Sequence, residues 1–339
     1  MPESGQPYSP TGSGALHCGP RGMAVFTDNR AYGESFLPAG TVGPFSPCDG
    51  VHAPEGVLVA AILDTTGDLY RADHGVPGWH HIFASGFSRG SQYDRLIRLV
   101  RESGAPDRVA CVARAGTGFH GFRQRSWSAS TGNIHLTVHL SPERPIHRFE
   151  TVFTALAAVA VADAIDATPG LAGRARIKWV NDVLVDGAKV AGVLAFTQTR
   201  SDTVTSVILG IGLNVETTPD VERSPFVPVA GSLRASAPDP TAVTAPAALR
   251  ALLDALAHRY GQVLAQGYGP IMDEYRGRCA IVGRDVTVCA DDGDAPPRVL
   301  AAGRVTAVGD GLEVYLDGQD DPVTKGRIIL DAAPGEGAP

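Results

Sequence analysis

Lysine is almost absent from this chain. Only Lys178, Lys189 and Lys325 stand among its 29 basic residues, and arginine supplies the rest. A lysine that persists in such a composition is a candidate for a task that needs a compact ammonium and not a planar guanidinium. The alternative is chance survival, because surface lysine and arginine exchange freely.

The chain also lacks an excess of basic residues and long apolar runs. The 29 Lys and Arg stand against 36 Asp and Glu, a formal net charge of −7, so a broad nucleic-acid or anionic-lipid surface has no electrostatic support. No stretch is apolar for long enough to span a bilayer, and the first twenty residues lack the features of a signal peptide. We expect a cytoplasmic protein that binds neither DNA nor membranes. Its partners should be small molecules or proteins.

Cysteine pairs are also missing. The five cysteines are odd in number and widely spread, and no Cys-x-x-Cys occurs. Neither a disulfide framework nor a zinc knuckle is therefore indicated.

At about 150 residues per domain, the chain length predicts two to three domains. Glycine- and proline-rich turns between short apolar stretches, of which Gly56–Leu63 is one, predict a β-rich N-terminal segment over residues 1–85. From there the pattern changes. Ser91 followed by Asp94 has the form of a capping box, and the apolar spacing behind it predicts a helix that ends at Gly104.

The core that follows mixes helices with strands. Residues 149–165 are apolar nearly all round, as in a helix buried against a sheet, and residues 247–264 predict an amphipathic helix. Strands are predicted at residues 109–113, 134–140, 177–180, 183–185, 189–196 and 204–213. The fold class is therefore α+β, with a core domain over residues 86–270. Asp-Gly turns between short strands predict a small barrel within residues 271–339, followed by a disordered tail.

Three segments concentrate the chemistry-bearing residues. They are Gly116–Trp127 (GTGFHGFRQRSW), Ile177–Leu194 (IKWVNDVLVDGAKVAGVL) and Gly210–Val215 (GIGLNV). Two of the three lysines and two of the three tryptophans fall in the first two segments. A glycine-bearing loop with arginines can close over phosphate groups and hold water away from them.

In this order and spacing the segments resemble the biotin protein ligases of the biotin/lipoate A/B ligase superfamily. That family's pattern is a GRGRxGRxW loop, a KWPND strand end with a K-x-x-G-I-L strand, and GIGxNV. The resemblance covers roughly residues 86–330. It implies a mixed or antiparallel sheet flanked by helices, similar to class II synthetases, and an SH3-like barrel at the C-terminus. Residues 1–85 lie outside it, and nothing there resembles the helix-turn-helix with which some members bind DNA.

The resemblance also implies a two-step reaction with ATP and Mg²⁺. A carboxylate attacks the α-phosphate of ATP, and an amine then captures the acyl-adenylate. Both reactants of the first step are anions, so fixed cations must bring them together. Lys178 would bridge the carboxylate and the α-phosphate, while Arg123 and Arg125 would neutralise phosphate charge. Asn214 would reach a phosphate or a magnesium-bound water.

Further nucleotide- and substrate-binding candidates come from the same segments and the helix before them. They are Ser91, Gly116, Thr117, Gly118, His120, Gly121, Trp127, Asn181, Asp182, Lys189, Gly192, Gly210 and Gly212. Two alternatives stay open among them. Lys189 either contacts the carboxylate side of the pocket or caps a hairpin strand. The strand glycines either admit a ligand to the backbone or relieve packing.

The loop departs from the family pattern in places. His120, Phe122 and Gln124 replace two arginines and a glycine, and Gly116 stands where the family has a glutamine. The expected substrate is a biotin-like carboxylic acid. An ordinary biotin carrier-protein ligase and a non-catalytic ligand-binding homologue are the alternatives. The expected acceptor amine is a carrier-protein lysine or a small molecule. The sequence is also compatible with a homodimer.

The same loop spells a dinucleotide fingerprint, Gly116-x-Gly118-x-x-Gly121. A Rossmann turn must open a helix, whereas a polar loop and a strand follow here, so this interpretation is set aside. His135 and His139 share one strand face and are expected to pack or to bond locally.

Overall fold

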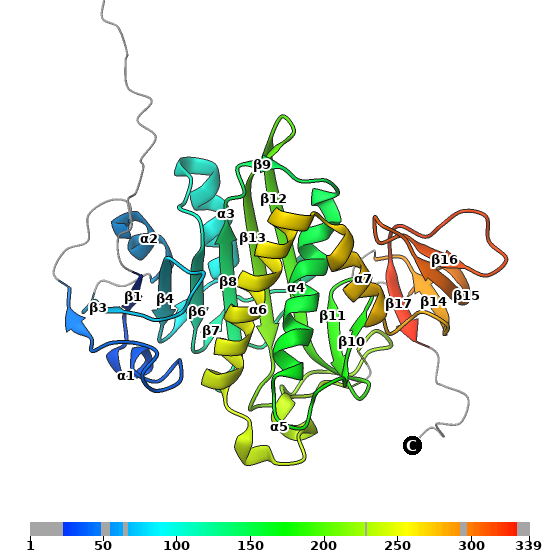
Figure 1. Ribbon diagram of the computed structural model, residues 1–339. Coiled ribbons are helices and arrows are strands. Elements are labelled where there is room, and N and C mark those ends of the chain that lie inside the picture. The colour runs from blue at the N-terminus through cyan, green and yellow to red at the C-terminus, as the bar shows by residue number, and fades with distance from the viewer. Residues whose placement is uncertain (1–22, 49–54, 64–66, 228, 292–296, 331–339) are drawn as a thin grey trace, which may run out of the picture.

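A computed structural model of the chain describes residues 23–48, 55–63, 67–227, 229–291 and 297–330. The expected C-terminal tail lies outside the described residues. One eleven-stranded mixed sheet forms the centre of the molecule (Figure 1). Its strands lie in the order β10 (Ala175–Lys178), β11 (Asp182–Val185), β12 (Ala188–Arg200), β13 (Thr203–Leu213), β8 (Ile134–Leu140), β6 (Val109–Ala113), β4 (His81–Ser85), β1 (Ala24–Thr27), β3 (Tyr70–Asp73) and β2 (Ser46–Pro47), while β9 (Arg144–Pro145) pairs with β13.

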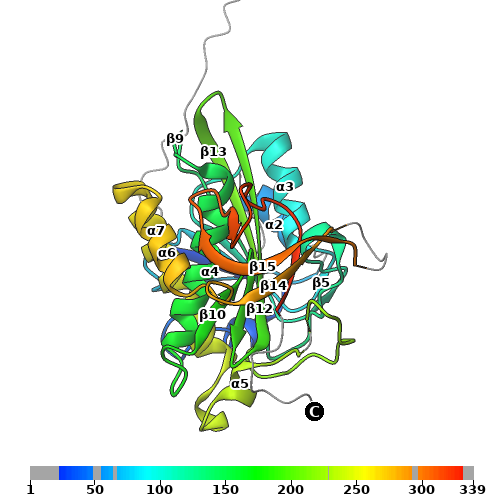
Figure 2. The same cartoon turned by 90° about the vertical axis from the view of Figure 1, so that its right-hand side faces the viewer.

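Helices cover both faces of the sheet, because alternate strand residues point to opposite sides. Val25, Ile82 and Ala110 belong to a large apolar cluster that includes α4 (Phe149–Asp166), α6 (Ala245–Gln266) and α7 (Gly269–Gly277). Phe26 and Phe83 belong to a second cluster with α2 (Glu55–Ile62) and α3 (Gln92–Ser103). Figure 2 shows the two helical layers on either side of the sheet.

The remaining elements are short. They are α1 (Arg30–Gly33), α5 (Leu233–Ser236), the 3₁₀ turns η1 (Phe122–Gln124) and η2 (Pro240–Ala242), and the paired strands β5 (Ser88–Arg89) and β7 (Gly116–Thr117). None of the helices in the described part of the chain combines the length and apolar character that crossing a membrane requires.

The N-terminal segment extends the central sheet. β1 runs parallel to β4, and β3 pairs antiparallel with β1, so the predicted strands join the core directly. The prediction of β structure at Gly56–Leu63 is wrong, because α2 occupies this stretch. Leu58 and Ile62 are four residues apart and are buried together in the second cluster. A short apolar run does not by itself distinguish a strand from a buried helix.

The helix after Ser91 is confirmed, but its capping box does not form. Ser91 occupies the N-cap position without a side-chain hydrogen bond to the first turn. The carboxylate of Asp94 accepts a hydrogen bond from His120 Nε2 at 2.8 Å instead of turning back to the cap. Gly104 ends the helix with a positive φ of 77°, as the sequence predicts.

A four-stranded antiparallel sheet follows the core and confirms the β-rich C-terminus. Its order is β16 (Val314–Leu316), β15 (Val299–Val308), β14 (Asp285–Cys289) and β17 (Arg327–Leu330). It attaches at the β10 edge of the central sheet. Trp179 Nε1 donates to the carbonyl of Leu312 at 2.7 Å, and Ile177 exchanges backbone hydrogen bonds with the chain around Cys279.

The junction between β1 and β4 is testable. The rings of Phe26 and Phe83 are stacked at 5.4 Å between centroids, and both are buried. Phe26→Ala should lower the free energy of unfolding by about 3–5 kcal/mol, because it leaves a cavity between sheet and helices. Denaturant unfolding measures this change. Val57→Ala, at a half-exposed valine, is the control and should stay within about 0.5 kcal/mol. Equal unfolding midpoints for the two variants would show that the N-terminal strands are not part of the core.

Candidate active site

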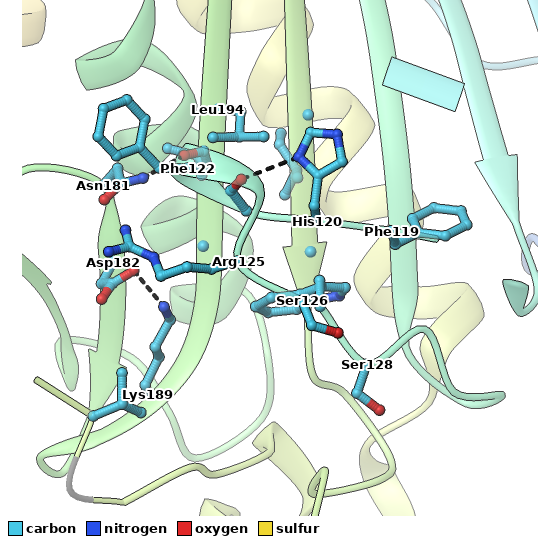
Figure 3. Close-up of a pocket in the computed structure, with 18 of the residues that line it drawn as sticks. Phe119, His120, Phe122, Arg125, Ser126, Ser128, Asn181, Asp182, Lys189 and Leu194 are labelled. Atoms are coloured by element: carbon cyan, nitrogen blue, oxygen red, sulfur yellow. Dashed lines mark hydrogen bonds and ion pairs between the residues drawn. The ribbon is translucent and has the colours of Figure 1, made fainter. Parts of the chain in front are cut away.

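A cavity of about 360 Å³ lies on the face of the central sheet that carries α3, and Tyr93 of that helix is among its lining residues. Side chains on β10, β12, β13 and β8 line it, and the loop after β7 closes over it (Figure 3). From β10 to β8 there are four interstrand steps of about 4.8 Å, so this floor spans about 19 Å.

The loop is folded back on itself as a narrow hairpin. The amide of Trp127 donates to the carbonyl of Phe119 at 3.0 Å, and the amide of Gly121 donates to the carbonyl of Arg125 at 2.7 Å. At its tip Arg123 and Gln124 adopt left-handed conformations, with φ of 55° and 59°. The backbone pairing therefore runs from the base of the loop to the turn at its tip.

Two glycines on β13 make room for aromatic rings. A Cβ on Gly212 would lie 2.3 Å from the Trp127 indole, and a Cβ on Gly210 would lie 3.0 Å from the Tyr93 ring. Both rings line the cavity. The structure supports the packing interpretation for these two glycines, since aromatic side chains lie directly above them.

Lys178 ends β10 with its side chain buried beside the cavity. Its Nζ donates to the carbonyl of Phe226, and it forms no ion pair within the described chain. Burial lowers the pKa of Lys178 to about 8. Asp182 opposes this shift, and the nearby charges of Lys189 and Arg327 contribute to it. An ammonium held in this way is suited to bind anions.

Lys189 forms an ion pair inside the cavity. Its Nζ lies 2.6 Å from Oδ1 of Asp182 (Figure 3). Lys189 lies on the hairpin strand β12 and its partner is a protein carboxylate, so a contact with a substrate carboxylate stays a prediction. Asn181 ties the turn between β10 and β11 to β12, because its amide donates to the carbonyl of Val193 at 2.8 Å.

Asn214 is buried at the end of β13. Its Nδ2 donates to the carbonyl of Gly231 at 3.0 Å, whereas its Oδ1 has no partner in the described chain. An oxygen left without a donor in a buried position is costly unless a ligand or an ion satisfies it. Asn214 is thus able to bind one.

His120 occupies the loop position where the sequence lacks an arginine. Its Nε2 contacts Asp94 and its Nδ1 contacts the carbonyl of Gly121 at 3.1 Å, so both ring nitrogens face acceptors. Burial lowers the pKa of His120, but the hydrogen bonds to Asp94 and Gly121 outweigh burial and raise it overall. This geometry favours the imidazolium.

A carboxylate from the C-terminal sheet holds both loop arginines. Oδ2 of Asp291 lies 3.3 Å from Nε of Arg123, and Oδ1 lies 3.1 Å from Nη1 of Arg125. The Asp291 side chain is only 9% exposed. Sequence reasoning missed this residue, because it lies more than 160 positions from the loop and belongs to no motif.

The structure brings most of the predicted site residues into one cavity. Those that line it are Ser91, His120, Gly121, Arg125, Trp127, Lys178, Asn181, Asp182, Lys189, Gly192, Gly210, Gly212 and Asn214. Gly116, Thr117, Gly118 and Arg123 are not among the lining residues. Gly116 and Thr117 form β7 at the base of the loop, and Arg123 lies at its tip beside Asp291.

Several aromatic residues that line the cavity were not among the site residues predicted from the sequence. Phe119 lies at the opposite end of the cavity from Lys189, packed on the backbone of Gly116 (Figure 3). His135 is buried beside it, with the two rings 5.6 Å apart. Both strand histidines bond locally as expected. His135 Nε2 contacts the carbonyl of Ser130, and His139 contacts the carbonyl of Pro106 and Ser206 Oγ.

Comparison with known proteins identifies the family. Residues 90–214 match the biotin/lipoate A/B protein ligase family. The chain is 31% identical over 184 residues to the biotin–acetyl-CoA-carboxylase ligase of Paracoccus denitrificans, a match that covers 52% of this chain and 72% of that protein. The chain belongs to the biotin/lipoate A/B protein ligase family. A second member, the bifunctional ligase/repressor BirA of Bacillus subtilis, is 32% identical over 182 residues, which cover 53% of this chain. The chain spans 54% of the length of that relative.

Solved structures of the family share the fold. Biotin protein ligase from Aquifex aeolicus, in complex with biotin and ATP, has a TM-score of 0.56 at 17% identity, over 74% of this chain and 99% of that one. A biotin protein ligase-like protein of unknown function from Silicibacter sp. TM1040 has a TM-score of 0.54 at 16% identity, over 75% of this chain and 95% of that one.

One departure from the family's loop pattern now has a structural consequence. The pattern has a glycine where this chain has Gln124. Gln124 adopts a φ of 59°, a conformation that glycine reaches without steric cost and that other residues disfavour. Gln124 therefore holds a conformation that the glycine of the family pattern would adopt at lower cost.

The ion pairs of Asp291 predict how accessible the loop is. Asp291→Asn removes the carboxylate that Arg123 and Arg125 share, so the tip should open more often. We expect limited tryptic cleavage after these arginines to become about two- to fivefold faster, as partly exposed ion pairs of up to about 1 kcal/mol imply. Mass spectrometry of the fragments measures the rate. Asp320→Asn, at an exposed carboxylate near β16, is the control. Wild-type cleavage rates in Asp291→Asn would contradict the assigned contact.

Proposed function

We propose that this protein is an adenylate-forming ligase. It activates a biotin-like carboxylic acid with ATP to form an acyl-adenylate, and it then transfers the acyl group to an amine to form an amide. The observation that carries the proposal is the environment of Lys178. A buried ammonium with no carboxylate partner in the described chain faces the same cavity as Arg125 and Asn214.

The first step requires two anions to approach each other. The carboxylate of the acid and the α-phosphate of ATP repel one another, and Lys178 lies where one cation can contact both. In a cavity shielded from water, one well-placed donor contributes about 3–4 kcal/mol to the transition state. The loop arginines and His120 add positive charge over the phosphate chain.

The end of the cavity near β8 suits the body of a biotin-like acid. Its walls include Phe119, Tyr93 and Trp127, which provide an apolar lining. Two polar atoms at this end have no partner in the described chain, Trp127 Nε1 and His135 Nδ1. Burial lowers the pKa of His135, and its Nε2 faces a carbonyl oxygen, so neutral His135 presents Nδ1 as an acceptor. A ring that carries both an N–H and a carbonyl matches this donor and acceptor.

The residues also fit a magnesium ion that the nucleotide brings with it. The described chain holds no cluster of three or more His, Cys, Asp or Glu side chains that could bind an ion alone. Mg²⁺ usually keeps several waters and takes few protein ligands beside phosphate oxygens. The unpartnered Oδ1 of Asn214 could accept from one such water. The ion would neutralise phosphate charge there.

The names of the relatives suggest the acid and the acceptor. The Paracoccus relative is named for biotin and acetyl-CoA carboxylase, and the Aquifex structure is a complex with biotin and ATP. We therefore propose biotin as the first acid to test and a carrier-protein lysine as the first acceptor.

Pyrophosphate exchange tests the proposal directly. We expect the purified chain to exchange labelled pyrophosphate into ATP only when a suitable acid is present, and biotin should be compared with lipoic acid and other carboxylic acids. Lys178→Ala should abolish the exchange, because no other described side chain can bridge carboxylate and phosphate at that place. Circular dichroism checks that the fold persists.

The chain offers a matched lysine for the control. Lys325 is exposed and does not line the cavity, so Lys325→Ala should keep the wild-type exchange rate. Exchange by Lys178→Ala at the wild-type rate would refute the role of Lys178. Tight binding of an acid without any exchange would instead favour a non-catalytic homologue.

The lowered pKa of Lys178 predicts a pH dependence. Lys178 is an ammonium below pH 8 and becomes neutral as the pH rises through its pKa of about 8. The exchange rate at low substrate concentration should therefore fall above pH 8, approaching tenfold for each further pH unit. A profile from pH 6.5 to 9.5 measures this fall. A rate that stays flat to pH 9.5 would show that the charge of Lys178 is not required.

A further inference from the structure

Arg327 is a cavity residue that comes from the C-terminal sheet. It opens β17 and lines the cavity together with its neighbours Gly326 and Ile328. Its guanidinium lies over the ring of Phe226, with 3.7 Å between the guanidinium carbon and the ring centroid. The carbonyl of the same Phe226 accepts from Lys178. Arg327 and Lys178 therefore contact opposite parts of one residue.

No carboxylate in the described chain forms an ion pair with Arg327. The two carboxylates nearest to it in the cavity are already engaged, Asp182 by Lys189 and Asp291 by Arg123 and Arg125. Burial lowers the pKa of Arg327 and the positive charge of Arg125 adds to this shift, while the carboxylates of Asp291 and Asp182 oppose it. The free protein thus holds like charges close together in a partly buried place, an arrangement that a polyanion would stabilise.

The position of Arg327 relative to Lys178 is informative. Lys178 lies on β10, the edge strand of the central sheet, and the C-terminal sheet attaches just beyond that edge (Figure 1). The aromatic end of the cavity lies on the other side, over β8. Lys178 consequently separates an apolar end from an end that Arg327 and Arg125 make positive.

We propose that Arg327 binds the β- and γ-phosphates of ATP and holds the pyrophosphate as it leaves. The inference rests on the proposed function and assigns one further substrate-binding residue to it. A planar guanidinium donates two parallel hydrogen bonds to phosphate oxygens, and stacking on Phe226 fixes its plane in advance. Arginine therefore suits this end of the cavity, whereas the compact ammonium of Lys178 suits the point where the two substrates meet.

The reaction at this end balances without a further reactant. A carboxylate oxygen forms a bond to the α-phosphorus, and the bond from that phosphorus to the oxygen that bridges to the β-phosphate breaks. The electron pair of the broken bond leaves with the pyrophosphate, whose negative charge rises as it departs. Arg327 donates hydrogen bonds to that growing charge.

Equilibrium binding of ATP and of AMP to the full-length chain tests the inference, because AMP lacks the two phosphates assigned to Arg327. Arg327→Gln should weaken ATP binding by about 10- to 100-fold, the size expected for charged hydrogen bonds to phosphate, and should leave AMP binding unchanged. Arg327→Lys should lie between the two. Arg304→Gln is the matched control, since Arg304 is an exposed arginine of the same sheet whose side chain donates to the carbonyl of Gly283.

The outcomes separate the two proposals. Wild-type ATP affinity in Arg327→Gln, or an equal loss of ATP and AMP affinity, overturns the assignment of Arg327 while the ligase proposal stands. A wild-type chain that neither binds ATP nor exchanges pyrophosphate with any acid overturns the ligase proposal itself. Thermal unfolding of each variant shows whether a loss of binding comes from a loss of fold. If Arg327→Gln unfolds, the ratio of ATP to AMP affinity in Arg327→Lys decides, and an unchanged ratio overturns the assignment.

Discussion

A buried ammonium without a carboxylate partner is the constraint on which the site depends. Taking a lysine out of water is unfavourable, and the lowered pKa of Lys178 reflects that cost. A single carbonyl, that of Phe226, compensates only part of it. The protein tolerates this arrangement because the surrounding core is extensive, with α4 buried along nearly its whole length. The charge of Lys178 is left for an anion from outside the chain.

Three separate parts of the fold surround that charge. The central sheet supplies a floor whose glycines seat two aromatic rings, the loop after β7 supplies cations from above, and the C-terminal sheet supplies Asp291 and Arg327 from the side. The contribution of the C-terminal sheet depends on how that sheet packs against the central sheet. Trp179 follows Lys178 directly and donates its indole N–H to the C-terminal sheet. The residue next to the buried ammonium therefore also anchors the domain that completes the cavity.

The sequence predicted what short-range patterns encode. The helix α4, the strands β6, β8 and β10 to β13, and the motif residues around Lys178, Trp127 and Asn214 all depend on neighbours within a few positions. What failed or was missed depends on contacts distant in sequence. Gly56–Leu63 is helical because its apolar residues pack against α3 and the sheet. The Asp94 carboxylate does not turn back to the N-terminus of its helix, because it accepts a hydrogen bond from His120. Asp291 and Arg327 reach the cavity because the C-terminal sheet packs against the central sheet. No residue spacing in the sequence predicts that contact. The small C-terminal barrel and the domain boundaries at residues 85 and 270 remain predictions.

The seating of Trp127 on Gly212 limits how a substrate can enter. The indole fills the space above the strand, and the Trp127 amide also bonds to Phe119, so both arms of the loop are fixed at their base. A rigid swing of the whole flap would lift the indole from its seat and break that bond. A motion of the loop that keeps both contacts therefore involves residues 120–126 alone.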